Sequence, residues 1–189
     1  AVLEREEKLE SACPLGSLPD RYEVIDGQIV EMPPVSDLSS TVTSRLQVIM
    51  GYHTLKADIG ETLVEALIQL PAPLNRKRRP DLCYISFERW PKDKAIEYRT
   101  NRREVVPDVA VEEKSPTDFG GDIFEKGVEY FRVGVRQVWI IYPRLRLLYI
   151  YDSITTVRGF TQYDIIDGGS AIPGLKFTLG ELFPKTAAG

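Results

Sequence analysis

The spacing of hydrophobic side chains changes along the 189-residue chain, and each change indicates an element of secondary structure. Residues 22–32 alternate apolar and polar positions on either side of an Asp-Gly pair, a pattern typical of a β-hairpin. After this segment the apolar residues recur every three or four positions, which predicts a helix that begins at Ser36 or Asp37. Glycine interrupts this pattern, so we expect the helix to end at Gly51 or Gly60.

Strand patterns dominate the remainder of the chain. We predict strands over residues 61–70, 80–87, 105–114, 138–142, 147–151 and 160–166. Residues 123–133 follow a helical period, and Gly134 fits a helix stop. No repeat or linker divides the chain, so we expect a single domain over residues 1–189 with a polar lead-in over 1–20. The order of elements predicts an α/β fold of the α+β type, with a central mixed β-sheet flanked by helices.

Composition narrows the class of protein. Hydrophobic residues make up 43% of the chain, enough for a folded core, and the longest apolar runs fall well short of a membrane span. No signal peptide is recognisable, and the two cysteines lack metal-site or disulfide-framework spacing, so we expect a cytoplasmic protein without a membrane partner. The single histidine, His53, argues against a Ser-His-Asp hydrolase. An enzyme of this composition would depend on carboxylates and lysines.

Charge is unevenly distributed. The chain carries a net charge of −4, yet residues 76–103 hold ten basic and four acidic residues. A basic segment on an acidic protein can steer a polyanion to one face, although a solvated loop explains the same charges. The candidate contacts to nucleic-acid phosphates are Arg76, Lys77, Arg78, Arg79, Arg102 and Arg103.

The strand predicted over residues 105–114 carries candidate chemistry. Alternation of side chains places Glu112 and Lys114 on one face, roughly 6.7 Å apart. Asp108 is on that face too, but about 13 Å away along the strand, too far to share an ion with Glu112. Asp81, on the preceding strand, is the better partner, and two carboxylates with a lysine suit a hydrolytic centre containing Mg²⁺ or Mn²⁺. Solvated charge on an edge strand is the alternative interpretation.

These residues also carry a resemblance to a known family. Pro80-Asp81, 30 intervening residues and then Glu112-Glu113-Lys114 resemble the PD-(D/E)XK nuclease superfamily, which has a restriction-endonuclease-like fold. The chain is more specifically similar to the Uma-two family of restriction endonucleases over about residues 20–184. The similarity is carried, in order, by residues 22–27, 31–32, 79–81, 107–112, 115–118, 126–130, 134–135, 138–139, 142–143, 173–175 and 182–183.

The resemblance implies that Asp81 and Glu112 bind the metal ion from adjacent strands. We count Glu113, the next residue of the motif, as a further candidate ligand. Many members of the family lack the strand lysine and are thought to use a lysine on the following helix, which is Lys126 here. This sequence has both Lys114 and Lys126, so both are candidates for positioning the attacking water.

Three further residues are possible additions to the site. Glu65 precedes Asp81 by one strand and could approach the metal, although an exposed position fits it equally well. Tyr130 lies on the predicted helix and could hydrogen-bond inward, although a core aromatic is the simpler interpretation. Asp108 is retained because it shares a face with Glu112.

The sequence therefore predicts a metal-dependent endonuclease, a hydrolase that cleaves phosphodiester bonds of DNA. A homodimer is expected because cleavage of both strands requires two centres. One alternative is a non-catalytic module that retains the nuclease fold and binds nucleic acid or protein, which the sequence pI of about 5.2 favours. Hydrolysis of RNA or of another phosphate ester is a further alternative.

Overall fold

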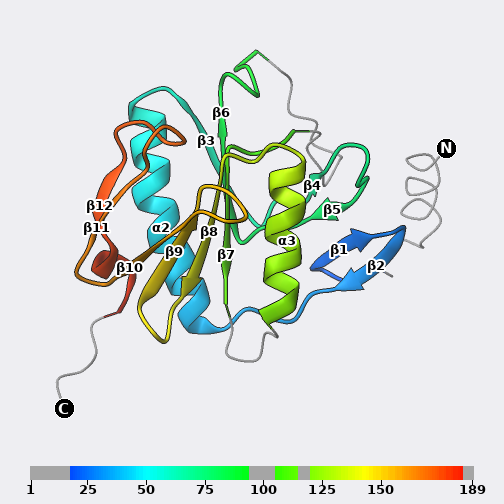
Figure 1. Ribbon diagram of the computed structural model, residues 1–189, viewed down its shortest axis with the longest axis horizontal. Coiled ribbons are helices and arrows are strands. Elements are labelled where there is room, and N and C mark those ends of the chain that lie inside the picture. The colour runs from blue at the N-terminus through cyan, green and yellow to red at the C-terminus, as the bar shows by residue number, and fades with distance from the viewer. Residues whose placement is uncertain (1–17, 94–104, 115–119, 185–189) are drawn as a thin grey trace.

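A six-stranded mixed sheet forms the centre of the protein in the computed structural model, which describes residues 18–93, 105–114 and 120–184 (Figure 1). The strand order is β10-β9-β8-β7-β6-β3, and only β7 and β8 run parallel among these neighbours. The strands are β3 (Gly60–Val64), β6 (Leu82–Ser86), β7 (Val109–Glu113), β8 (Gln137–Tyr142), β9 (Leu147–Tyr151) and β10 (Val157–Thr161). This arrangement confirms the predicted mixed sheet.

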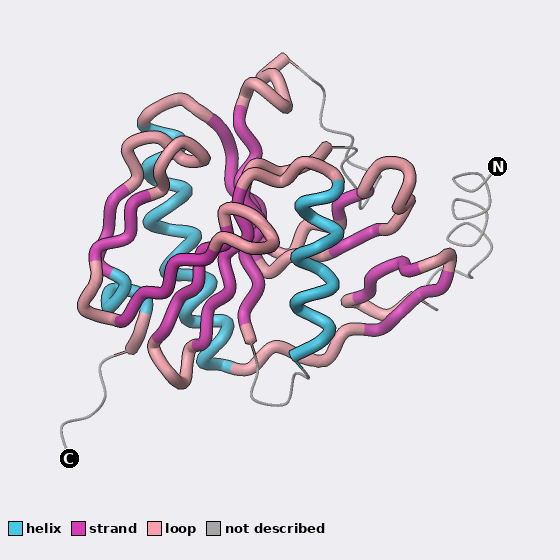
Figure 2. Tube along the Cα trace, viewed as in Figure 1, coloured by secondary structure: helices cyan, strands magenta, loops and turns pink. Residues whose placement is uncertain are grey.

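One helix covers each face of this sheet, α2 (Asp37–Lys56) on one side and α3 (Gly120–Arg132) on the other (Figures 1 and 2). Val111 of β7 belongs to the hydrophobic core beneath α2, whereas Ala110 belongs to the core beneath α3. Strand β7 is therefore covered on both faces, and a charged side chain on it is removed from bulk water. In the ranges that the structure describes, no helix has both the length and the hydropathy needed to cross a membrane.

A smaller sheet lies on the α3 side of the molecule (Figure 1). Its order is β2-β1-β5-β4, and its strands are β1 (Tyr22–Ile25), β2 (Gln28–Glu31), β4 (Ile68–Gln69) and β5 (Lys77–Arg78). Tyr22 and Val24 pack with Leu67 in a small core of their own. On the α2 side, the chain ends with β11 (Ile165–Asp167), β12 (Lys176–Thr178) and the short 3₁₀ helix η1 (Leu179–Leu182).

The predicted start of helix α2 is confirmed, whereas its predicted end is not. Ser36 is the N-cap of α2, and its hydroxyl accepts a hydrogen bond from the Ser39 N–H at 3.2 Å. The prediction that Gly51 or Gly60 ends the helix is wrong. Gly51 lies within α2, where its missing Cβ leaves room for Thr62, and the helix continues to Lys56.

Two predicted strands are each divided between two sheets. The prediction for residues 61–70 is wrong because the chain bends at Glu65, which has a φ of 48°, and continues from β3 of the large sheet into β4 of the small one. The prediction for residues 160–166 is wrong because the carboxylate of Asp164 accepts the Thr161 N–H at 2.7 Å and forms a turn after β10. Alternation alone does not reveal such a change of sheet.

Candidate active site

Asp81 and Glu112 lie opposite one another at the end of two antiparallel strands. Leu82 of β6 pairs with Val111 of β7, so continuing this register by one residue places Asp81 across from Glu112. Opposed residues of an antiparallel pair point to the same face, which here is the face covered by α3. The Oδ2 atom of Asp81 also accepts the backbone N–H of Glu113 at 2.7 Å, which holds the carboxylate against the end of β7.

Helix α3 directs a row of polar side chains toward Glu112 and toward the small sheet. Lys126, Glu129 and Tyr130 are spaced three and four residues apart and therefore share one helix face. The Lys126 Nζ lies 3.4 Å from Glu112 Oε2, and the Tyr130 hydroxyl donates to Glu112 Oε1 at 2.7 Å. Both carboxylate oxygens of Glu112 are thus contacted from α3. Tyr130 is both a core aromatic and an inward hydrogen-bond donor, so the two interpretations of it are compatible.

The N-terminal hairpin contributes a further carboxylate, Glu23. Its Oε1 lies 3.0 Å from Lys126 Nζ and accepts the Arg79 N–H at 3.0 Å, while its Oε2 accepts from Arg78 at 2.7 Å. We did not predict Glu23, because an acidic residue that alternates with apolar neighbours in a hairpin is normally solvent-exposed. Nothing in the local pattern indicates that this face of the hairpin is turned toward α3.

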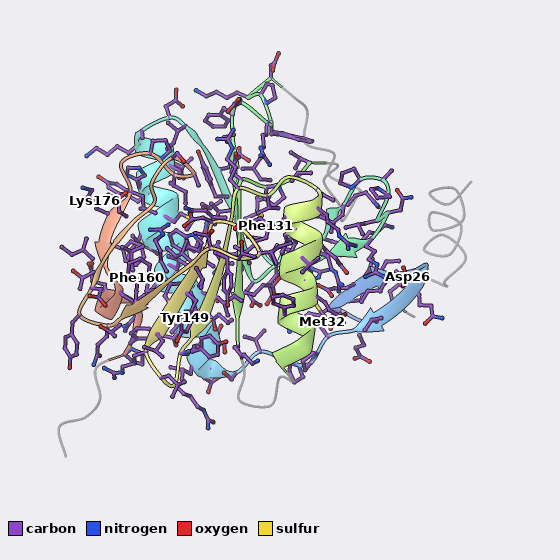
Figure 3. The ribbon with its side chains drawn as sticks, viewed as in Figure 1. Asp26, Met32, Phe131, Tyr149, Phe160 and Lys176 are labelled. Carbon is purple, nitrogen blue, oxygen red and sulfur yellow. The ribbon has the colours of Figure 1, made fainter. Side chains whose placement is uncertain are left out.

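A cleft of about 560 Å³ connects these side chains. The first turn of α2 and the segment after the hairpin form the rim of this cleft. Met32, labelled in Figure 3, belongs to that segment. The charged residues that line it are Arg21, Glu23, Glu31, Arg78, Asp81, Glu112, Glu113, Glu125 and Lys126. Acidic side chains outnumber basic ones in this set, so the cleft favours a cation.

Burial changes the ionisation of the acidic residues. Desolvation raises the pKa of Asp81 to about 6 and the pKa of Glu112 to about 7, against the opposing effect of the Lys126 ammonium. Burial also raises the pKa of Glu113 to about 7, despite the hydrogen bond from Thr43. For Glu23, the charges of Lys126 and Arg78 outweigh burial and hold its pKa below the usual value. The carboxylates at the end of β7 therefore have less compensating positive charge than their burial demands.

These carboxylates fit a divalent cation that takes only part of its ligands from the protein. Within the described residues, no group of three or more His, Cys, Asp or Glu side chains is arranged to hold a metal ion. Asp81 and Glu112 nevertheless present hard oxygen atoms, and Mg²⁺ commonly binds one or two carboxylates together with water and phosphate oxygens. Among the described residues, Glu113 Oε2 is buried without a hydrogen-bond partner, on the α2 side of β7.

Two other residues that the sequence predicted for this site have side chains in different surroundings from Glu112. Glu113 also lines the cleft, but its side chain points to the opposite face of β7 from Glu112, where Thr43 of α2 donates to its Oε1 at 2.7 Å. Lys114 lines a different hollow, with Phe124 and Phe131 on another face of α3, so it is not grouped with Lys126.

Asp108 and Glu65 occupy positions outside the carboxylate pair. Asp108, before the start of β7, is fully buried and forms ion pairs with Arg89 and Arg136 at 3.1 and 3.2 Å, a structural role away from Glu112. Glu65 is 2.9 Å from Arg21, whose guanidinium also lies 3.9 Å from Asp81 Oδ1. The Glu65 side chain thus connects to Asp81 through Arg21.

The proposed phosphate contacts in residues 76–79 need correction. Lys77 is fully buried, and the guanidinium of Arg78, although it lines the cleft, is bound by the buried carboxylates of Glu23 and Glu129, which favours a structural role for both side chains. Arg76 forms ion pairs with Asp26 and Glu129, and Arg79 donates to main-chain carbonyls of the neighbouring segments. Two of these basic residues, Arg76 and Arg78, thus neutralise buried acids of the protein itself. Arg102 and Arg103 lie outside the described residues.

The mixed sheet, with opposed carboxylates at the end of β6 and β7, has the restriction-endonuclease-like fold. The crystal structure of a putative nuclease belonging to DUF820 from Anabaena variabilis ATCC 29413 superposes with a TM-score of 0.74, at 18% sequence identity, over 86% of this chain and 89% of that chain. The chain belongs to the Uma2 family, described as putative restriction endonucleases, whose model matches residues 7–180. This match confirms the resemblance seen in the sequence motifs. Comparison with curated proteins found no match.

Proposed function

We propose that this protein is a metal-dependent endonuclease that hydrolyses phosphodiester bonds of DNA. The observation that carries the proposal is the convergence of Asp81 and Glu112 on one cleft, with the Lys126 Nζ 3.4 Å from Glu112. Membership of a family of putative restriction endonucleases supports a nucleic-acid substrate. The fold shared with the putative nuclease from Anabaena variabilis is consistent with the same chemistry.

In this proposal each residue of the pair and its neighbours has a distinct role. Asp81 and Glu112 hold Mg²⁺ or Mn²⁺, which would supply the positive charge that polarises a scissile phosphate and makes a water more acidic. Lys126 positions the attacking water, since its ammonium lines the cleft and contacts Glu112, whereas Lys114 lines a separate hollow. Tyr130 fixes the orientation of the Glu112 carboxylate through its hydrogen bond.

Cleavage assays on isosteric variants test these roles. Asp81→Asn and Glu112→Gln should each abolish Mg²⁺- or Mn²⁺-dependent cleavage of plasmid and linear duplex DNA while circular dichroism remains unchanged. Lys126→Met should lower the single-turnover rate by about 10²–10⁴-fold, and Lys114→Met should leave it close to wild type. Wild-type cleavage by either carboxylate variant would refute the assignment, and the reverse ranking of the lysines would transfer the role to Lys114.

A metal titration separates the enzyme from a non-catalytic binding module. Calorimetry should detect Mn²⁺ binding in the wild type and its loss in Asp81→Asn. A protein that shows no carboxylate-dependent Mn²⁺ site and cleaves neither DNA nor RNA would be a binding module that retains the nuclease fold. Cleavage of RNA alone would keep the mechanism and change the substrate.

We also propose a homodimer, because cutting both strands of a duplex requires two centres. Sedimentation should give a mass of about twice the 21.4 kDa of one chain, alone or with duplex DNA. A monomer in both conditions that introduces only single-strand nicks would refute the dimer and leave the catalytic proposal intact.

A further inference from the structure

We infer that Glu23 is a positioning residue, whose carboxylate holds the ammonium of Lys126 in the cleft when a cation engages Glu112. The inference rests on the proposed function, because it concerns the lysine of the same site. Glu23 is not a candidate ligand in this scheme, and its effect on the reaction passes through Lys126.

The contacts of Lys126 are the first step of the argument. Its Nζ lies between two carboxylates, 3.0 Å from Glu23 Oε1 and 3.4 Å from Glu112 Oε2, so the shorter contact is to Glu23. A divalent cation on Glu112 would repel the ammonium and compete for the same carboxylate. An ammonium buried to this degree needs another anion nearby, and Glu23 provides it.

The second step is that Glu23 is held in place. It is only 4% exposed, and its carboxylate is held by Arg78 at 2.7 Å and by the Arg79 N–H at 3.0 Å. Arg78 in turn donates to both oxygens of Glu129 at 2.8 and 2.9 Å.

Glu129 and Lys126 lie one turn apart on α3. The contacts from Lys126 to Glu23, from Glu23 to Arg78 and from Arg78 to Glu129 therefore form a closed network that joins β1, β5 and α3. Because Arg78 contacts Glu23 and Glu129 at once, Glu23 has little freedom to move away from Lys126. This network therefore fixes the distance between the hairpin and Lys126, whether or not a cation is bound to Glu112.

Two substitutions at Glu23 distinguish a fixed position from a simple charge effect. Glu23→Gln removes the charge, whereas Glu23→Asp keeps the charge but shortens the side chain by one methylene, so that the carboxylate withdraws from Lys126. Glu88→Gln is the matched control, because Glu88 is an exposed acid that pairs with Arg136 at 2.9 Å and does not line the cleft.

The first measurement needs neither metal nor activity. Acylation of Lys126 in EDTA by a water-soluble N-hydroxysuccinimide ester, measured by mass spectrometry, should be at least five-fold faster in Glu23→Asp and Glu23→Gln than in the wild type and Glu88→Gln. Release of the ammonium from its shorter contact is the physical reason. Equal labelling rates in all four proteins would overturn the inference.

The second measurement is a double-mutant cycle on single-turnover DNA cleavage at saturating Mn²⁺. Glu23→Asp and Glu23→Gln should lower the rate by about 10²-fold, the loss expected for a misplaced catalytic group, while Glu88→Gln stays close to wild type. In a Lys126→Met background, Glu23→Gln should cause no further loss. An additional loss there would overturn the inference by showing that Glu23 acts independently of Lys126.

The two measurements keep this inference separate from the proposed function. If the wild type does not cleave DNA with Mn²⁺, the proposed function fails and the labelling rates still decide whether Glu23 holds Lys126. If melting curves show that Glu23→Gln does not fold, Glu23→Asp, which keeps a charged partner for Arg78, carries both tests.

Discussion

At the scale of single residues, the carboxylates at the end of β7 combine burial with a shortage of positive charge. Lys126 is shared between Glu23 and Glu112, and the ion pair that Asp81 forms within the described residues is a distant one, with Arg21 at 3.9 Å. An acid buried in this way is harder to ionise than in the unfolded chain. The candidate site should therefore lower the stability of the metal-free protein at neutral pH.

Asp81→Asn should stabilise the metal-free protein in a pH-dependent way. The folded-state pKa of Asp81 is about 6, above its usual value of 3.8, so its contribution to stability is present below pH 4 and is lost as the pH rises to 6. Asparagine removes this loss and can still accept the Glu113 N–H. The free energy of unfolding of the variant should exceed that of the wild type by up to about 3 kcal/mol above pH 6 and match it near pH 4.

Urea unfolding in EDTA at pH values from 4 to 8 measures this difference. The exposed Asp20 supplies the control, since Asp20→Asn should change the stability little at any of these pH values. A stability gain that is independent of pH would contradict the assigned ionisation of Asp81.

Tyr130→Phe should weaken metal binding at neutral pH without disturbing the core. The Tyr130 hydroxyl donates to Glu112 and lowers its pKa, so removing the hydroxyl should raise that pKa above about 7 and leave less of the carboxylate ionised at pH 7. Calorimetric titration with Mn²⁺ should show affinity lower by about 10-fold at pH 7, with a smaller loss at pH 8.5. Tyr84→Phe is the control, because the Tyr84 hydroxyl donates to the Ile59 carbonyl elsewhere in the sheet. An equal loss in both variants would indicate a general packing effect.

At the scale of elements, the position of each site residue follows from strand register and helix face. The pairing of β6 with β7 sets Asp81 across from Glu112, and the face of α3 brings Lys126 and Tyr130 above them. On the other face, Thr43 connects α2 to Glu113. Strand β3 completes this part of the sheet by pairing with β6, and its first residue is Gly60.

Two glycine-to-alanine substitutions should have opposite effects on stability. A Cβ at Gly60 would lie 2.4 Å from the Ile85 carbonyl oxygen, so Gly60→Ala should force β3 away from β6 and destabilise the protein by about 2–3 kcal/mol. A Cβ at Gly127 of α3 would meet nothing within 4 Å, so Gly127→Ala should stabilise the protein by about 0.5–1 kcal/mol. Thermal melting of both variants checks the pair, and destabilisation by Gly127→Ala would contradict the open space beside α3.

At the scale of the whole molecule, a buried ion network joins the small sheet to α3. Arg78 of β5 contacts Glu23 of β1 and Glu129 of α3, and all three side chains are almost fully buried. The turn between β1 and β2 is exposed, and its residue Asp26, labelled in Figure 3, forms an ion pair with Arg76. The network thus determines where the hairpin, and with it Glu23, lies relative to the large sheet.

Arg78→Met should therefore be strongly destabilising. It leaves two buried carboxylates short of their main partner, and breaking a buried ion pair from one side costs about 3–5 kcal/mol. Arg158→Met is the control, since Arg158 and Asp152 form a largely exposed pair worth less than about 1 kcal/mol. Chemical denaturation measures both, and similar small losses would show that Arg78 does not hold the small sheet in place.

Much of the fold could be predicted from the sequence because it depends on local patterns. The Asp-Gly turn, the Ser36 cap and the apolar periods identified the hairpin, α2 and most of the large sheet. The same reasoning failed at Glu65 and after Thr161, where the chain keeps a strand pattern while it moves to another sheet. Local alternation reports that a residue is extended but not which strand it joins.

The acidic pair of the candidate site could be predicted from the sequence, whereas the side chains that surround the pair could not. Asp81 and Glu112 follow from strand alternation and a motif, whereas the cluster at residues 76–79 was read as a ligand surface although it lies against buried acids. Sequence determined the elements, the two carboxylates and the membership of the family, because those depend on short-range spacing and on motif order. Tertiary structure alone decided that Lys126 and Glu23 meet beside Glu112 while Lys114 does not, because packing of α3 against two sheets brings together charges far apart in the chain.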